Sequence, residues 1–126
     1  MIRLYLITAG IIATGLGGMI LFAPVAFYAG YGIEPAGQVN LLNELRSHGL
    51  AVLAAGLFAT AAAFVGRLTP AAMIVTSALY LSYGLSRLVA IILDGMPSAS
   101  LLAAGAVELV LGLAGLGLLL RQRASH

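Results

Sequence analysis

Four long apolar stretches restrict the fold of this chain more than any other feature of its sequence. They lie at about residues 3–23, 43–66, 70–93 and 98–120. Each is long enough to cross the hydrocarbon core of a membrane, which takes about 20 mostly apolar residues in a helix. Only 8% of the residues are charged, whereas soluble domains carry about 25%. The sequence therefore predicts an all-α membrane protein, in which residues 1–126 form one domain built as a four-transmembrane-helix antiparallel bundle.

The segments between the stretches carry residues that end and begin helices. Residues 24–42 contain two prolines and three aromatic residues, whose rings suit the level of the lipid headgroups. In the sequence GRLTP, we expect Thr69 to cap the third helix and Pro70 to take its first position, where the missing N–H costs nothing. Because the later connections are short, the second, third and fourth helices are expected to be neighbours.

The positions of the arginines predict the orientation, because cytoplasmic loops are enriched in basic residues. We interpret the first stretch as a retained span, since no small-residue cleavage site follows it. Both termini are then expected in the cytoplasm, with residues 24–42 and 94–97 on the outer side. The basic residues that flank the predicted cytoplasmic side are Arg3, Arg67, Arg121 and Arg123.

Small residues recur at helical spacing and indicate where helices pack closely, since lipid supplies no hydrophobic drive for association. Two interpretations of these residues stay open. They pack the helices of one bundle together, or they form a face that contacts another copy of the chain in a homo-oligomer or another membrane protein. The three sets are Gly10, Thr14 and Gly18 on the first helix; Ala51, Ala55, Ala59 and Ala63 on the second; and Gly105, Gly112 and Gly115 on the fourth.

Several classes of chemistry are excluded or disfavoured by composition. The chain has no cysteine, which excludes disulfides, thiolate metal sites and cysteine nucleophiles. A net charge of +2 without a basic run gives no indication of nucleic-acid binding. One histidine near carboxylates and two arginines is a poor set of metal ligands. We therefore predict no metal, no cofactor and no catalytic residue, and we lean against an enzyme.

The second helix begins with LNELRSHGL, in which helical phase separates the polar residues. Glu44 and His48 are four apart and share a face, which we expect to look into the bundle. Arg46 points elsewhere and is predicted to anchor at the outer headgroups.

The third and fourth helices carry the other polar residues of the outer half. Tyr80, Tyr83, Arg87 and Asp94 form one stripe of the third helix. Glu108 lies roughly 15 Å from the outer end of the fourth helix, near the bilayer midplane. A charge there costs about 2.5–3.5 kcal/mol on insertion scales. Glu108 must therefore pair, protonate or face a wet cavity. We predict Arg87 as its first partner and His48 as its second.

The segments NELRSHGL and RLVAIILDGMPSASLLAAGAVEL resemble a family of small four-helix membrane proteins, the bacterial domain of unknown function 4345. The resemblance implies that the hallmark polar positions of the family are Glu44, Arg46, Arg87, Asp94 and Glu108. It also implies the bacterial inner (plasma) membrane, and it brings no reaction with it. A more distant likeness to DoxX-like membrane proteins is an analogy of fold alone.

Three hypotheses for the function follow. In the first, an outer-half pocket holds a small amphiphile, a lipid headgroup or an anion, with Arg87 and Glu108 as its floor and Glu44 at its rim; His48, Tyr80, Tyr83 and Asp94 complete the expected ligand-binding set. In the second, the polar network only fixes helix register in a structural or accessory subunit of a membrane complex. In the third, Glu108 and His48 serve an enzyme or a proton-coupled transporter.

Overall fold

The computed structural model describes residues 1–125, which form helices joined by turns, and these residues contain no strand. Four of the helices are long and apolar enough to cross a membrane, which confirms the predicted all-α fold. In chain order the elements are α1 (Ile2–Phe22), α2 (Pro24–Ala29), α3 (Val39–Ala62), the short 3₁₀ helix η1 (Gly66–Leu68), α4 (Thr69–Asp94) and α5 (Ala99–Ala124).

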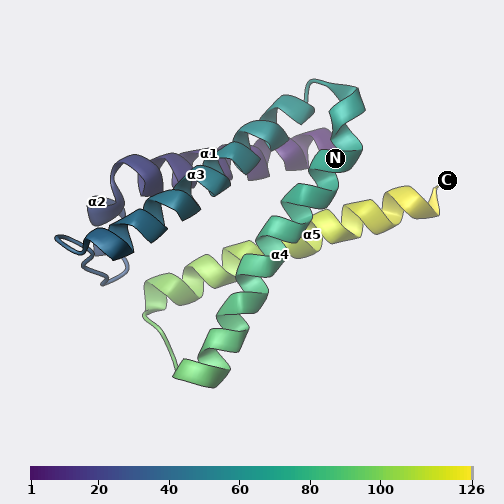
Figure 1. The fold of residues 1–126 in the computed structure, drawn as a ribbon. Helices are drawn as coiled ribbons and strands as arrows, with labels where there is room; N and C mark the ends of the chain where they lie inside the picture. The colour runs from purple at the N-terminus through teal and green to yellow at the C-terminus, as the bar shows by residue number, and fades with distance from the viewer. Residues whose placement is uncertain (126) are drawn as a thin grey trace.

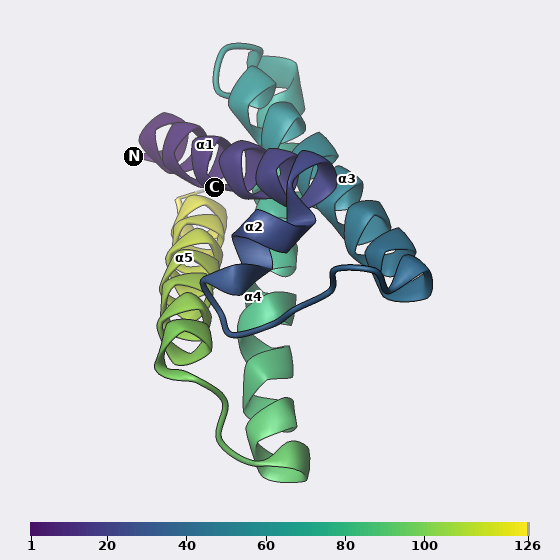
Figure 2. The same ribbon diagram turned by 90° about the vertical axis from the view of Figure 1, so that its left-hand side faces the viewer.

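The long helices form two pairs that diverge from one another. Helix α1 lies along α3, and α4 crosses α5, whereas α3 and α4 contact each other far less. The N-terminus and the C-terminal end of α5 lie at the end where α3 turns through η1 into α4, and α2 lies at the opposite end of α1 (Figures 1 and 2). We refer to these two ends of the molecule as the termini end and the α2 end.

The pairing of α1 with α3 depends on glycines two helical turns apart. A Cβ atom added to Gly56 would lie 2.6 Å from Thr14 Oγ1, and one added to Gly49 would lie 2.7 Å from the backbone nitrogen of Leu21. Gly10 and Gly17 meet α3 equally closely. The backbones therefore approach each other to a distance that only glycine allows.

The predicted seam of residues four apart holds for only part of these two helices, at Gly10, Thr14 and Ala59. A Cβ atom at Gly18 would meet no atom within 4 Å, and Ala51 is exposed. A spacing of seven keeps successive residues on one narrow face of a helix, whereas successive steps of four drift around it. The prediction for the fourth helix is confirmed, because Gly105, Gly112 and Gly115 are its buried residues.

Bulky side chains fill the interior at the termini end. Leu6 and Met73 are fully buried there, together with Tyr5, and leucines in the C-terminal part of α5 pack around them. Because the two helix pairs converge at this end and diverge toward α2, the α2 end is left less completely filled.

Two helix ends differ from the sequence prediction. Helix α3 begins at Val39 and ends at Ala62, about one turn earlier at each end than expected, because hydropathy marks the hydrocarbon rather than helix termini. Thr69 is the first residue of α4 and does not cap it. Its hydroxyl instead donates to the carbonyl oxygen of Ala62 over 3.0 Å, which satisfies a carbonyl left free where α3 stops.

Candidate functional site

An ion pair joins α4 to α5 at mid-helix. Arg87 Nη2 donates to Glu108 Oε1 over 2.8 Å, and Arg87 Nε donates to Glu108 Oε2 over 3.3 Å. The side chain of Arg87 is 34% exposed and that of Glu108 16%. The structure thus brings together the pair that the sequence predicts, in the two-bond geometry that suits a guanidinium and a carboxylate.

Gly105 makes room for this arginine. It lies one turn before Glu108 on α5, and a Cβ atom there would lie 3.3 Å from Arg87 Cγ and 3.4 Å from Arg87 Cβ. The aliphatic stem of Arg87 therefore lies against the bare backbone of α5, which directs its guanidinium toward the carboxylate one turn further along.

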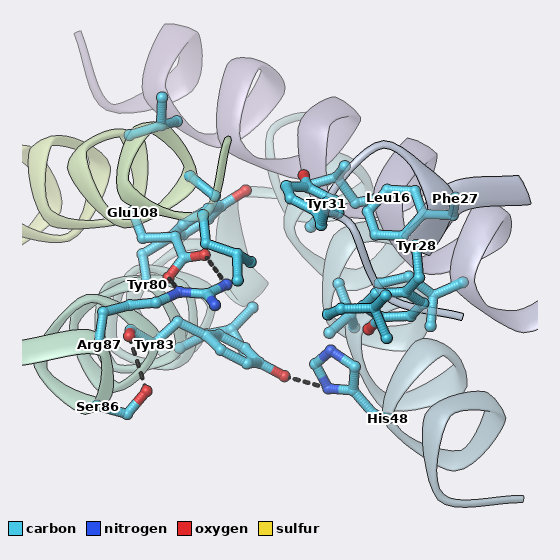
Figure 3. Close-up of a pocket in the computed structure, with 18 residues that line it drawn as sticks. Leu16, Phe27, Tyr28, Tyr31, His48, Tyr80, Tyr83, Ser86, Arg87 and Glu108 are labelled. Carbon is cyan, nitrogen blue, oxygen red and sulfur yellow. Dashed lines mark hydrogen bonds and ion pairs between the residues drawn. The ribbon is translucent and has the colours of Figure 1, made fainter. Parts of the chain in front are cut away.

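A second polar contact bridges α3 and α4. The hydroxyl of Tyr83 lies 2.5 Å from His48 Nδ1, and the two rings meet at 62° with centroids 5.2 Å apart. Tyr83 reaches from α4 across to α3, close to the guanidinium of Arg87 (Figure 3). A phenol donates readily to a neutral imidazole nitrogen, which would leave the other ring nitrogen as a donor.

Both contacts line one cavity at the α2 end, with a volume of about 500 Å³. Its walls come from all four long helices and from the segment after α1 (Figure 3). Most of the surface is apolar, contributed by Ala13, Leu16 and Ile20 of α1 and by Val52 of α3 among others. The polar residues of the lining come from more than one side: Tyr83, Ser86 and Arg87 of α4, Glu108 of α5, His48 of α3, and Tyr28 and Tyr31 from the segment after α1.

Tyr80 also lines the cavity, but its hydroxyl is already engaged. It donates to the carbonyl oxygen of Ala9 over 2.6 Å, and the side chain is buried. The ring of Tyr80 therefore serves as a wall and as a link between α4 and α1.

The aromatic residues after α1 form the cover of the cavity. Phe27 and Tyr28 belong to α2, Tyr31 follows it, and all three line the cavity. Their rings pack on one another, with the centroids of Phe27 and Tyr28 5.1 Å apart. Sequence reasoning missed this role, because rings suited to the headgroup level can equally face lipid. The signal was Pro24, which starts a new helix at the end of α1.

Tyr28 belongs to the cover and lies outside the membrane-spanning helices. Its position at the cavity changes the pKa of its phenol. Burial raises the pKa of Tyr28 above its ordinary value, the positive charge of Arg87 opposes that rise, and Tyr31 adds to it. Tyr28 is therefore a neutral phenol at physiological pH, available as donor or acceptor beside the guanidinium.

Three of the predicted polar residues lie outside the cavity. Glu44 and Asp94 are exposed and do not line it. Glu44 does share a helical face with His48, but α3 has already diverged from α4 at that level, so no helix opposes it. Arg46 Nη1 donates to the carbonyl oxygen of Leu21 over 2.5 Å. Its guanidinium thus satisfies a free carbonyl at the C-terminal end of α1, where the helix dipole favours a cation.

The chemistry of the cavity is that of a neutral, hydrogen-bonding site. The guanidinium and the carboxylate cancel in charge, and each retains hydrogen-bonding capacity beyond their mutual contact. Residues 1–125 contain no group of three or more His, Cys, Asp or Glu side chains placed to hold a metal ion.

Comparison with known proteins identifies one family. The family described as "Domain of unknown function (DUF4345)" matches residues 1–119. Searches of the curated proteins and of the solved structures found no match. The family match covers every residue of the ion pair, of the His48–Tyr83 contact and of the aromatic cover.

Proposed function

Since the chain belongs to the DUF4345 family, whose function is unknown, we propose its role from the site itself: it is a multi-pass membrane protein that binds a small amphiphile, a lipid headgroup or an anion in the cavity at the α2 end. The observation that carries this proposal is a cavity with mostly apolar walls that is also lined by the Arg87–Glu108 ion pair and by His48. A volume of about 500 Å³ also falls within the roughly 300–1,000 Å³ of small-molecule sites.

The distribution of polar groups supports a ligand with two parts. A polar head fits beside Arg87, Glu108 and His48, where it meets donors and acceptors together. An apolar body fits against Leu16, Ile20 and the other aliphatic walls.

Analysis of small molecules retained by the purified protein tests this proposal. The variant carries Arg87→Met and Glu108→Gln together, so that no unpaired charge remains in the membrane. We expect mass spectrometry of organic extracts to find an amphiphile with the wild type and at least tenfold less with the variant. Arg46→Met is the matched control, because it removes a guanidinium outside the cavity and should retain the wild-type amount. Equal retention by all three proteins would refute the proposal.

The two-bond ion pair supports a second candidate, a structural or accessory subunit of a membrane complex. Because it joins α4 to α5, the pair could serve only to fix the register of these helices. In that case a partner protein should co-purify from mild detergent with the wild type, and the cavity should contain no bound molecule other than detergent.

We also propose the plasma membrane of a bacterium as the location, with both termini in the cytoplasm. The support is the gathering of Arg3, Arg67, Arg121 and Arg123 at the termini end, as expected for cytoplasmic ends of spans. The chain has no cysteine, so single cysteines can report topology. An impermeant maleimide should label Ala36→Cys in intact cells and leave Ser125→Cys unlabelled; the reverse pattern would invert the orientation.

A further inference from the structure

Helices α3 and α4 separate on one side of the cavity. They are linked at the termini end, where Thr69 bonds to Ala62, and they diverge from there toward the α2 end (Figure 2). His48 and Val52 of α3 and Leu79 and Tyr83 of α4 line the cavity along this divergence. We name these four residues the portal.

The lipid-facing surface of α4 leads into the portal. A shallow depression runs along α4 over the exposed residues Ile74 and Val75. It shares Leu79, Tyr83 and Ser86 with the cavity. An apolar chain lying against α4 in the membrane is therefore in contact with the edge of the cavity, without any passage through water.

One hydrogen bond crosses the portal. Between α3 and α4, the side-chain hydrogen bonds of residues 1–125 are the Thr69–Ala62 bond at the far end and the Tyr83–His48 bond within the portal. The Tyr83 ring spans the space between the two helices (Figure 3). A single hydrogen bond contributes little net free energy to holding two helices together, so this contact can open and reform thermally.

We propose, on the premise of the proposed function, that the ligand is a membrane-dissolved amphiphile that reaches the cavity laterally between α3 and α4, and that the Tyr83–His48 hydrogen bond is the latch of this portal. Opening the latch widens the space between the helices and frees the hydroxyl and the imidazole nitrogen. Both groups then lie beside the Arg87–Glu108 pair, where the polar head of the ligand is expected. The apolar body follows through the gap lined by Val52 and Leu79.

Site-directed labelling in vesicles tests the portal. A single cysteine at Val52, which is buried and lines the cavity but not the depression along α4, reports access through the gap, and N-dodecylmaleimide dissolved in phosphatidylcholine vesicles is the probe. In this background, Tyr83→Phe removes the latch hydroxyl while keeping the ring. We expect labelling to become between about twofold and tenfold faster, the range that loss of one hydrogen bond allows. His48→Phe should accelerate it similarly, and the two changes together should add nothing further.

A cysteine at Leu85 is the control. Leu85 is an exposed residue of α4 outside the cavity, so its labelling should be equal with and without Tyr83→Phe. If Tyr83→Phe leaves labelling at position 52 unchanged, or if a sulfonated water-soluble maleimide reacts there faster than the alkyl reagent, the portal is refuted while the retention experiment stands. If labelling is latch-dependent but retention does not depend on Arg87 and Glu108, the proposed function is refuted and the lateral opening remains.

Discussion

Replacing Arg87 with methionine leaves the Glu108 carboxylate without its guanidinium near the middle of a membrane-spanning helix. The carboxylate side chain is 16% exposed, so water replaces the lost partner only in part. An unpaired charge at this depth costs about 2.5–3.5 kcal/mol on insertion scales. Because the arginine it faces is itself one-third exposed, we expect a loss somewhat below that range, about 2 kcal/mol in the free energy of unfolding.

The reciprocal change and the double change complete a thermodynamic cycle. Glu108→Gln leaves the guanidinium unpaired, but Arg87 can extend its side chain toward more polar surroundings, so its loss should be smaller, about 1 kcal/mol. With both changes no charge is stranded, and the stability should return to within about 1 kcal/mol of the wild type. The coupling energy is then about 2 kcal/mol, far above the few tenths of a kcal/mol within which independent sites add.

Unfolding in mixed micelles, followed by circular dichroism as SDS is increased, measures each corner of this cycle. Glu44→Gln is the control, because it neutralises an exposed carboxylate on α3 and should change stability by no more than about 0.5 kcal/mol. If the double variant loses the sum of the two single losses, the pair does not couple α4 to α5, and our account of the site is wrong.

Three further predictions concern packing, positioning and protonation. Gly56→Leu should destabilise the protein by at least about 2 kcal/mol in the same assay, because its side chain would strike Thr14 on α1; a wild-type unfolding curve would contradict the close α1–α3 contact. Gly105→Leu should displace the stem of Arg87 and reduce retained amphiphile while the helical content stays unchanged; full retention would contradict the positioning role of Gly105. In ring-labelled tyrosine NMR, Tyr28 should ionise above its ordinary value of 10.0, since burial raises its pKa. Removing the charge with Arg87→Met should raise that pKa further, and a fall would contradict the assigned contact. Because the folded pKa is the higher one, the stabilisation from neutral Tyr28 is complete below pH 10 and is lost as the pH rises through the folded value.

The sequence predicts well what the membrane dictates. The thickness of the hydrocarbon core requires an apolar stretch for each span, so the four helices can be predicted from the hydropathy along the chain. The pairing of Arg87 with Glu108 follows from the same constraint, because two opposite charges at similar depth on successive helices have few other partners. Helical phase correctly groups Tyr83 with Arg87 on one side of α4.

The angles at which the helices cross one another cannot be predicted from hydropathy or from helical phase. Phase gives the face shared by Glu44 and His48, but whether a helix opposes that face depends on how far α3 diverges from α4. The same uncertainty applies to Tyr80, whose hydroxyl reaches the backbone of α1 at Ala9 because of how these two helices cross. The position of α2 over the cavity likewise cannot be predicted from the sequence, since an aromatic residue such as Phe27 fits equally well in a headgroup layer.

The location of the polar residues within the fold favours binding over a purely structural role. An ion pair that only fixed the register of α4 and α5 would need no open space beside it. Arg87 and Glu108 instead lie on the wall of the space that opens where the two helix pairs diverge. In our proposal, an apolar occupant covers the apolar surface of that space, and the pair gives the occupant a polar contact. A divergent bundle with its charges in the gap is therefore better suited to hold a second molecule than to hold itself together.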